Sequence, residues 1–130
     1  MLIKGIHHVS MNCSTDDVFE KAKDFYIGVL GLKVFREWNE GILLDTGSGI
    51  IEIFAGKENT GEVGAIRHFA LLTEDVDRLA DSIRKAGYDV FIDPDDRVIP
   101  CDPPYRLRMA FCSEPLGEHI ELFCPKGEGS

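Results

Sequence analysis

The sequence lacks any hydrophobic run of the roughly 18 residues that a membrane-spanning helix needs. It also lacks the features of a secretory signal, because residues 1–5 include a lysine and no long apolar stretch follows them. The hydrophobic share of 44% over 130 residues is nevertheless sufficient for a stable core. We therefore expect a folded cytoplasmic protein that neither spans a membrane nor is exported.

Basic residues are scarce. The chain has 14 Lys and Arg against 23 Asp and Glu, which gives a net charge of −9. Nucleic acids and anionic membranes are bound through basic surfaces, so this balance argues against both as partners. Positive charge gathers locally at Arg97, Arg106 and Arg108, where a small anion could still bind. The expected partner is a small-molecule substrate.

Metal-binding cysteine motifs are also missing. None of the four cysteines forms a C-x-x-C pair, and no zinc-finger spacing occurs. In a protein without an export signal, we expect these thiols to stay reduced. Cys112 and Cys124 lie in apolar, strand-like runs, where cysteine behaves as a small hydrophobic residue. We predict that both pack in or near the core.

What the sequence does contain is one pattern of elements, strand–helix–strand–strand–strand, written twice. In the first copy, caps at Thr15 or Asp16 predict the helix start, and Gly28 and Gly31 predict its end. In the second copy, Glu74 and Asp75 open the helix. Alternating or continuous apolar runs bounded by turn residues predict the strands. The predicted strands are residues 3–12, 32–38, 42–46, 50–55, 65–73, 88–92, 107–112 and 118–124.

The repeat sets the expected domain organisation. We predict a single domain made of module one (1–56), a linker (57–63), module two (64–125) and a loose tail (126–130). A period of about 60 residues indicates duplication, since two copies cannot stack as a solenoid. The fold class is α+β, with two tandem modules forming a curled mixed sheet. We expect a helix to cover one face of each half-sheet and the other faces to surround a cleft.

Each copy places a histidine on its first strand and a glutamate on its last. Side chains alternate along a strand, so the glutamate within Ile50–Phe54 points away from Ile51 and Ile53. A carboxylate in the middle of an apolar strand is costly unless it is paired or coordinated. This costly feature occurs at matched places in both copies, and that repetition is the main functional signal. The four residues are His8, Glu52, His68 and Glu121.

Two imidazoles and two carboxylates suit a divalent metal such as Ni, Co, Zn or Mn, and affinity alone would not choose among them. Four protein ligands would leave up to two octahedral positions for water or substrate. A single histidine near a strand start is more often a surface residue, and His7 and His119 are interpreted in that way. A vestigial site that binds no metal remains an alternative for the whole set.

Four segments in order give the chain a family resemblance. They are Ile6-His7-His8-Val9, Asp24-Phe25-Tyr26 with Leu30-Gly31-Leu32, Arg67-His68-Phe69-Ala70, and Gly117-Glu118-His119-Ile120-Glu121-Leu122. With these segments the chain resembles the vicinal oxygen chelate superfamily, also called the glyoxalase/bleomycin resistance/dioxygenase fold. The resemblance implies paired βαβββ modules and a metal that chelates two substrate oxygens. It places the family's four metal ligands at His8, Glu52, His68 and Glu121.

Glutamate at the second ligand position resembles lactoylglutathione lyase, whereas the related methylmalonyl-CoA epimerase tends to have glutamine there. We therefore expect a homodimeric, isomerase-type metalloenzyme that transfers a proton next to a carbonyl through an enediolate stabilised by the metal. The catalytic base would be Glu121, or Glu52 as second choice. The bacterial lyase holds glutathione with an Arg and an Asn, but here those places are Asn12 and Gly56. The thiol therefore stays open. The alternatives are a CoA-thioester epimerase, a dioxygenase, and a non-catalytic binding or resistance protein.

The second copy also contains an Asp- and Pro-rich insertion, residues 93–104, which we predict to be a long loop. It runs into a strand on which Arg106 and Arg108 share one face. If that face lines the cleft, the two guanidinium groups would bind a substrate carboxylate or phosphate. If it points outward, they would form surface ion pairs with the Asp-rich segment.

Overall fold

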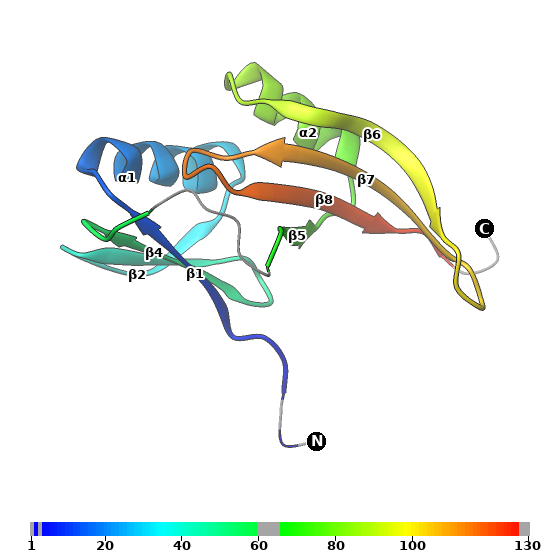
Figure 1. Ribbon diagram of the computed structural model, residues 1–130, viewed down its shortest axis with the longest axis horizontal. Helices are drawn as coiled ribbons and strands as arrows, with labels where there is room; N and C mark the ends of the chain where they lie inside the picture. Colours follow the sequence, from blue (N-terminus) through cyan, green and yellow to red (C-terminus); the bar gives the residue numbers. More distant parts are fainter. Residues whose placement is uncertain (1, 3, 60–65, 128–130) are drawn as a thin grey trace. The chain divides into compact units, whose positions relative to one another are not determined.

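The computed structural model describes residues 2, 4–59 and 66–127. The chain divides into two compact units, residues 1–62 and 63–130. Figure 1 traces the first unit from blue to green and the second from green to red. Each unit contains a four-stranded mixed sheet and helical segments. The predicted α+β class with tandem modules is therefore confirmed. Within the described residues, no helix has the length and apolar character needed to cross a membrane.

The first unit has the element order βαβββ. Its sheet order is β1-β4-β3-β2, in which β1 runs parallel to β4 and the other neighbours are antiparallel. The first and last strands of the unit are therefore hydrogen-bonded neighbours. The elements are β1 (His8–Cys13), α1 (Asp16–Lys23), a π-helical turn η1 (Asp24–Val29), β2 (Lys33–Trp38), β3 (Gly41–Asp45) and β4 (Ile50–Ala55).

The ends of the first helix are fixed by its caps. The Thr15 side chain accepts a hydrogen bond from the Val18 N–H, and two aspartates in the first turn favour the helix dipole. The predicted start is confirmed. Gly28 lies inside η1, whereas Gly31 adopts a φ of 77° just after the helical segment, where a residue with a Cβ would be strained. Four side chains of this segment are buried: Phe19, Ala22, Phe25 and Tyr26.

The second unit repeats the topology of the first. Its sheet order is β5-β8-β7-β6, again with the first and last strands parallel. The predicted duplication therefore holds at the level of strand pairing as well as element order. The elements are β5 (Phe69–Leu72), α2 (Val76–Lys85), β6 (Val90–Ile99), β7 (Tyr105–Ser113) and β8 (His119–Pro125).

Helix α2 covers one face of the second sheet. The Asp75 side chain caps it by accepting from the Arg78 N–H. The helix buries Val76, Ala80 and Ile83, and it packs on β6, β7 and β8. Its apolar stripe has the spacing expected of a surface helix that is half buried on a core.

The predicted loop at residues 93–104 is wrong over most of its length. Residues 93–99 continue β6, and residues 95–99 pair with β7, so that Ile99 lies opposite Tyr105. Pro94 is tolerated because β6 is an edge strand, and because the pairing register shifts between Ile92 and Asp95. The Pro and Asp content suggested a loop, but the pairing with β7 decides the structure.

Other boundaries differ by a few residues. Strand β1 begins at His8 rather than residue 3, and β5 begins at Phe69 rather than residue 65. Residues 3 and 65, most of the predicted linker 57–63 and the last three residues of the tail 126–130 lie outside the described residues. Cys112 is fully buried as predicted, and this burial raises the pKa of its thiol to about 12. Cys124 is only half buried.

The turn between β7 and β8 is held by a buried carboxylate. Glu114 is only 4% exposed, and its Oε1 accepts hydrogen bonds from the N–H groups of Leu116 and Glu118, both at 2.8 Å. Hydrogen bonds to a charged acceptor are stronger than neutral ones. This carboxylate therefore satisfies two backbone donors of the turn that leads into β8.

We predict that Glu114→Ala lowers the free energy of unfolding by about 1–3 kcal/mol, because it leaves two N–H groups without their acceptor. Urea unfolding monitored by circular dichroism measures the effect. Glu118→Ala, four residues away and exposed, is the matched control and should change stability by no more than about 0.5 kcal/mol. Equal losses in the two variants would contradict a capping role for Glu114.

Candidate functional site

In the first unit, the parallel pairing of β1 and β4 brings His8 and Glu52 together. Ser10 lies directly opposite Glu52, so His8, two residues earlier on β1, is a diagonal neighbour on the same face. The His8 Nε2 atom lies 3.7 Å from the Glu52 Oε1 atom. The residues predicted for module one therefore form a close pair.

The second unit forms an equivalent pair. Ala70 lies opposite Glu121, and His68 is again two residues earlier, immediately before β5. The His68 Nε2 atom lies 3.3 Å from the Glu121 Oε1 atom. Both units thus use the same diagonal register and the same ring nitrogen, as expected for two copies of one arrangement.

Strand alternation separates each glutamate from the core. Ile51 and Ile53, which flank Glu52, are buried on the side where α1 packs. Ile120 and Leu122 flank Glu121 and are buried in the same way beside α2. The glutamates face the opposite side, with side chains 19% and 14% exposed. The predicted direction of both carboxylates is confirmed within each unit.

Each pair presents one nitrogen and one carboxylate oxygen at a separation close to that of adjacent ligands on a divalent metal. Metal–nitrogen and metal–oxygen bonds of about 2.0–2.2 Å place adjacent ligands roughly 3.0–3.4 Å apart. The separation in the second unit falls within this range, and that in the first is a few tenths of an ångström longer. Each pair supplies only half of a four-ligand set. Among the described residues of either unit, no cluster of three or more metal-binding side chains occurs.

Different neighbours support the two imidazoles. In the second unit, the His68 ring packs edge-on against Phe111, with centroids 5.0 Å apart, and Phe111 lies directly opposite Glu121. In the first unit, the His8 Nδ1 atom lies 2.9 Å from the Nδ1 atom of His7. His119 packs against another aromatic ring and stays exposed, as expected of a surface residue.

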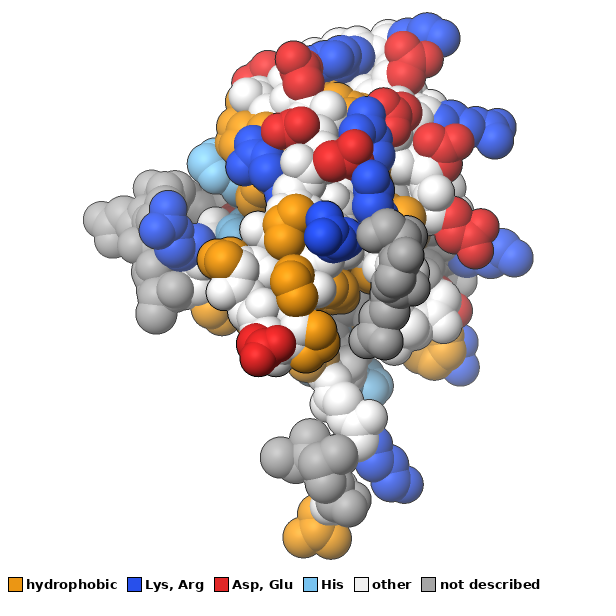
Figure 2. Space-filling view, turned by 90° about the vertical axis from the view of Figure 1, so that its right-hand side faces the viewer, with side chains coloured by type: hydrophobic (Ala, Val, Ile, Leu, Met, Phe, Trp, Pro, Cys, Tyr) orange, Lys and Arg blue, Asp and Glu red, His pale blue; other side chains and the backbone are white. Residues whose placement is uncertain are grey.

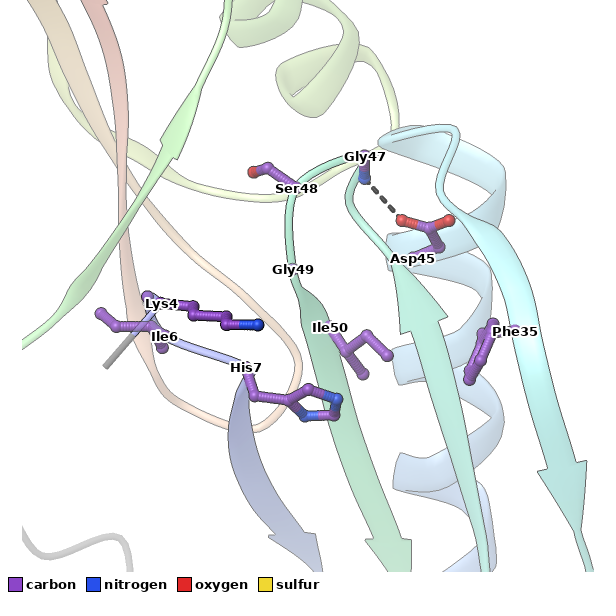
Figure 3. A pocket seen from close by; sticks show the side chains of 10 residues that line it. Lys4, Ile6, His7, Phe35, Asp45, Gly47, Ser48, Gly49 and Ile50 are labelled. Carbon is purple, nitrogen blue, oxygen red and sulfur yellow. Dashed lines mark hydrogen bonds between the residues drawn. The ribbon is translucent and has the colours of Figure 1, made fainter. Parts of the chain in front are cut away.

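A pocket of about 450 Å³ lies beside the first pair, within the first unit. Figure 3 shows Lys4 and His7 approaching it from the segment before β1, with Ile50 on β4 and Phe35 on β2 on its other sides. Ile50 lies opposite His8, so the pocket adjoins the histidine end of the pair. The sequence did not reveal it, because residues 4–7 read as part of a strand.

On β7, Arg108 forms ion pairs with aspartates. Arg108 lies opposite Cys124, on the face that α2 covers, whereas Glu121 lies opposite Phe111 on the other face. The Arg108 guanidinium group donates to both carboxylate oxygens of Asp77 on α2, at 2.6 and 2.8 Å, and to Asp96 at 3.1 Å.

Of the two alternatives for Arg106 and Arg108, these contacts agree with surface ion pairs rather than with binding of a substrate anion. Arg106, two residues earlier on β7, has the same parity as Arg108, so β7 does not direct this pair of arginines toward the side of the sheet that carries Glu121. Arg97 bonds to Asp95, its neighbour on β6. Figure 2 shows acidic and basic side chains interspersed over the upper part of the face drawn, rather than gathered by sign.

Comparison with protein families identifies a match over most of the chain. Residues 5–122 match the model of the Glyoxalase/Bleomycin resistance protein/Dioxygenase superfamily. The chain is also 30% identical over 135 residues to the uncharacterized protein YwkD of Bacillus subtilis, with 95% of this chain and 98% of that protein covered.

Solved structures show the same fold. The glyoxalase family protein from Enterococcus faecalis is 27% identical, with a TM-score of 0.70 and coverage of 95% of this chain and 99% of that chain. The putative glyoxalase family protein from Bacillus anthracis is 22% identical, with a TM-score of 0.73 and coverage of 95% and 97%. The latter shows a common fold alone.

We predict that Arg108→Gln raises the pKa of the Asp77 carboxyl toward its ordinary value. The hydrogen bonds from Arg108 hold that pKa below its usual range, so the pairing is present at neutral pH and is lost as pH falls and Asp77 becomes protonated. Carboxyl ¹³C chemical shifts measured against pH report the change. Arg97→Gln is the control and should leave the Asp77 pKa unchanged; a shift of equal size in that variant would refute the specific pairing.

Proposed function

Because the chain belongs to the glyoxalase/bleomycin resistance protein/dioxygenase superfamily, we propose that it is a metal-dependent lyase or isomerase that moves a proton next to a carbonyl group. The observation that carries the proposal is the repeated His–Glu pair. A partly buried carboxylate lies within 4 Å of an imidazole nitrogen at the same register position of both units. Residues without a common role would not be expected to repeat the same pair at the same register.

The proposed ligands are His8, Glu52, His68 and Glu121, and together they bind one divalent ion such as Ni, Co, Zn or Mn. Two nitrogen and two carboxylate donors form a set of borderline hardness, which suits these metals. Neither pair alone provides enough ligands for a stable site. The complete site requires one pair from each unit, either of one chain or of two chains in a homodimer.

Removing one histidine should abolish most metal binding. We expect the purified protein to carry about one divalent ion per proposed four-ligand site and His68→Ala to lose most of it, because three remaining ligands bind more weakly. Elemental analysis and equilibrium dialysis against Zn, Ni, Co and Mn measure the content. His119→Ala, which removes an exposed histidine from the same unit, is the matched control. A wild-type protein that takes up none of the four metals would end the proposal.

The proton is moved by a carboxylate of this chain. We assign Glu121 as the base that removes a proton from the carbon next to the carbonyl and returns it to the neighbouring carbon. Glu121 is the less exposed of the two glutamates and lies opposite Phe111 on β7. When bound, the metal would stabilise the negative charge that develops on the substrate oxygen. Glu52 is the second choice.

The proposed substrate is the hemithioacetal of methylglyoxal and a thiol, and the thiol need not be glutathione. Asn12 stands at one of the two positions associated with glutathione binding, and its side chain donates to the Glu58 carbonyl at 3.3 Å. Gly56 stands at the other and has no side chain to contribute. A second candidate is therefore an epimerase of a CoA thioester, which does not use glutathione.

We predict that Glu121→Gln abolishes turnover while retaining much of the metal, because an amide oxygen can still coordinate but cannot accept the proton. A loss of 100-fold or more in kcat is expected, on the order of a general-base contribution. Methylglyoxal with glutathione or another thiol, methylmalonyl-CoA and a catechol under air form the substrate panel. Full activity of the variant would assign the base elsewhere. Tight binding without turnover of any compound would indicate a binding protein.

A further inference from the structure

The segment before β1 places a second histidine against the proposed ligand His8. The two Nδ1 atoms lie 2.9 Å apart, which is an ordinary hydrogen-bond distance, and the rings are nearly perpendicular, at 88°. The Nε2 atom of His8 is left facing Glu52. The imidazole of His8 therefore contacts His7 through Nδ1 and has Glu52 as the nearest charged group to Nε2.

The chemistry of neutral imidazole limits how this contact can form. A neutral ring carries one N–H and one lone pair, so only one of the two facing Nδ1 atoms can hold the hydrogen. If His8 Nδ1–H donates to His7, the lone pair of His8 lies on Nε2, toward Glu52. If His7 Nδ1–H donates to His8, then Nε2 of His8 carries the hydrogen instead. Only the first arrangement leaves Nε2 able to bind a metal.

We infer that His7 is a positioning residue for the metal site. By accepting a hydrogen bond from His8 Nδ1–H, it fixes the ring orientation of His8 and keeps the Nε2 lone pair directed toward the ligand position beside Glu52. Partners of this kind on the second ring nitrogen are typical of metal-binding histidines. The inference rests on the proposed function, because it assigns His8 as a ligand.

The backbone and the pocket both restrain His7. Its carbonyl accepts a hydrogen bond from the Ile50 N–H at 3.0 Å, which joins the segment before β1 to the start of β4. Its ring forms one wall of the pocket, facing Ile50 (Figure 3). The backbone of His7 is therefore hydrogen-bonded to β4, the strand that carries Glu52, and this restrains the position of its ring.

In the second unit, the imidazole of His68 has a different neighbour from that of His8. The residue before His68 is Arg67, which has no acceptor atom on its side chain. The His68 ring instead packs edge-on against Phe111. Position 7 is therefore specific to the first half of the site, and Arg67 offers a matched control at the equivalent place.

The test compares Zn²⁺ affinity in three variants at position 7, measured by competition with a chromophoric chelator. His7→Phe keeps the ring but has no acceptor, and we expect it to weaken binding about 10- to 100-fold, the usual effect of losing such a partner. His7→Ala should do the same. His7→Asn places an amide oxygen near the position of Nδ1 and should restore most of the affinity. Arg67→Ala should leave affinity within about twofold of the wild type, since Arg67 has no such role.

Long-range ¹H–¹⁵N spectra provide a second readout that does not depend on turnover. In the Zn²⁺-loaded wild type, His8 should carry its hydrogen on Nδ1. In the metal-free protein, His7→Asn should retain Nδ1–H on His8, whereas His7→Phe should shift the hydrogen to Nε2. Unchanged Zn²⁺ affinity in both the Phe and Ala variants would overturn the inference. If the wild type binds no metal, the proposed function fails, and the metal-free spectra still test the His7–His8 contact.

Discussion

The parallel pairing of the first and last strand in each unit is the constraint on which the candidate site depends. Parallel neighbours need a crossover connection, and the intervening helix and two strands provide it. The pairing places residues that are 44 or 53 positions apart in sequence next to each other on one face. A register slip of one residue would turn each glutamate into the core and bring its apolar neighbours out. The buried isoleucines that flank Glu52 therefore fix the register that the site requires.

The direction of the two glutamates could be predicted from the sequence, because burial and strand alternation are local patterns. Glu52 between two isoleucines could face only away from the core, and the repeat supplied a second, independent instance at Glu121. Tertiary pairing was the part that local patterns could not supply. Residues 93–99 carry Asp and Pro and resemble a loop, yet β7 provides enough hydrogen-bonding partners to make them an edge strand. The direction of Arg108 likewise depended on the absolute parity of β7, which only the register with β8 settles.

The net charge of −9 gives little information about the site, because the charges that matter for binding are set by local pairing. Asp77 and Asp96 are neutralised by Arg108 and Lys126 on the α2 side of the second sheet. These groups are exposed, so they contribute little to stability, but they occupy the guanidinium group that would otherwise be available for an anion. Arg108 is therefore not available as the anion-binding group that the sequence suggested as one alternative.

The two His–Glu pairs share one register but have different surroundings. The backbone supplies the same His–Glu diagonal in both units, but its surroundings have diverged. The first unit places a polar partner, His7, behind its imidazole, which suits a ligand that must be held in one orientation. The second places Phe111 beside both His68 and Glu121. A phenyl ring does not donate a hydrogen bond to the carboxylate. This difference in surroundings is the reason why the proposed function assigns the base to Glu121 rather than to Glu52.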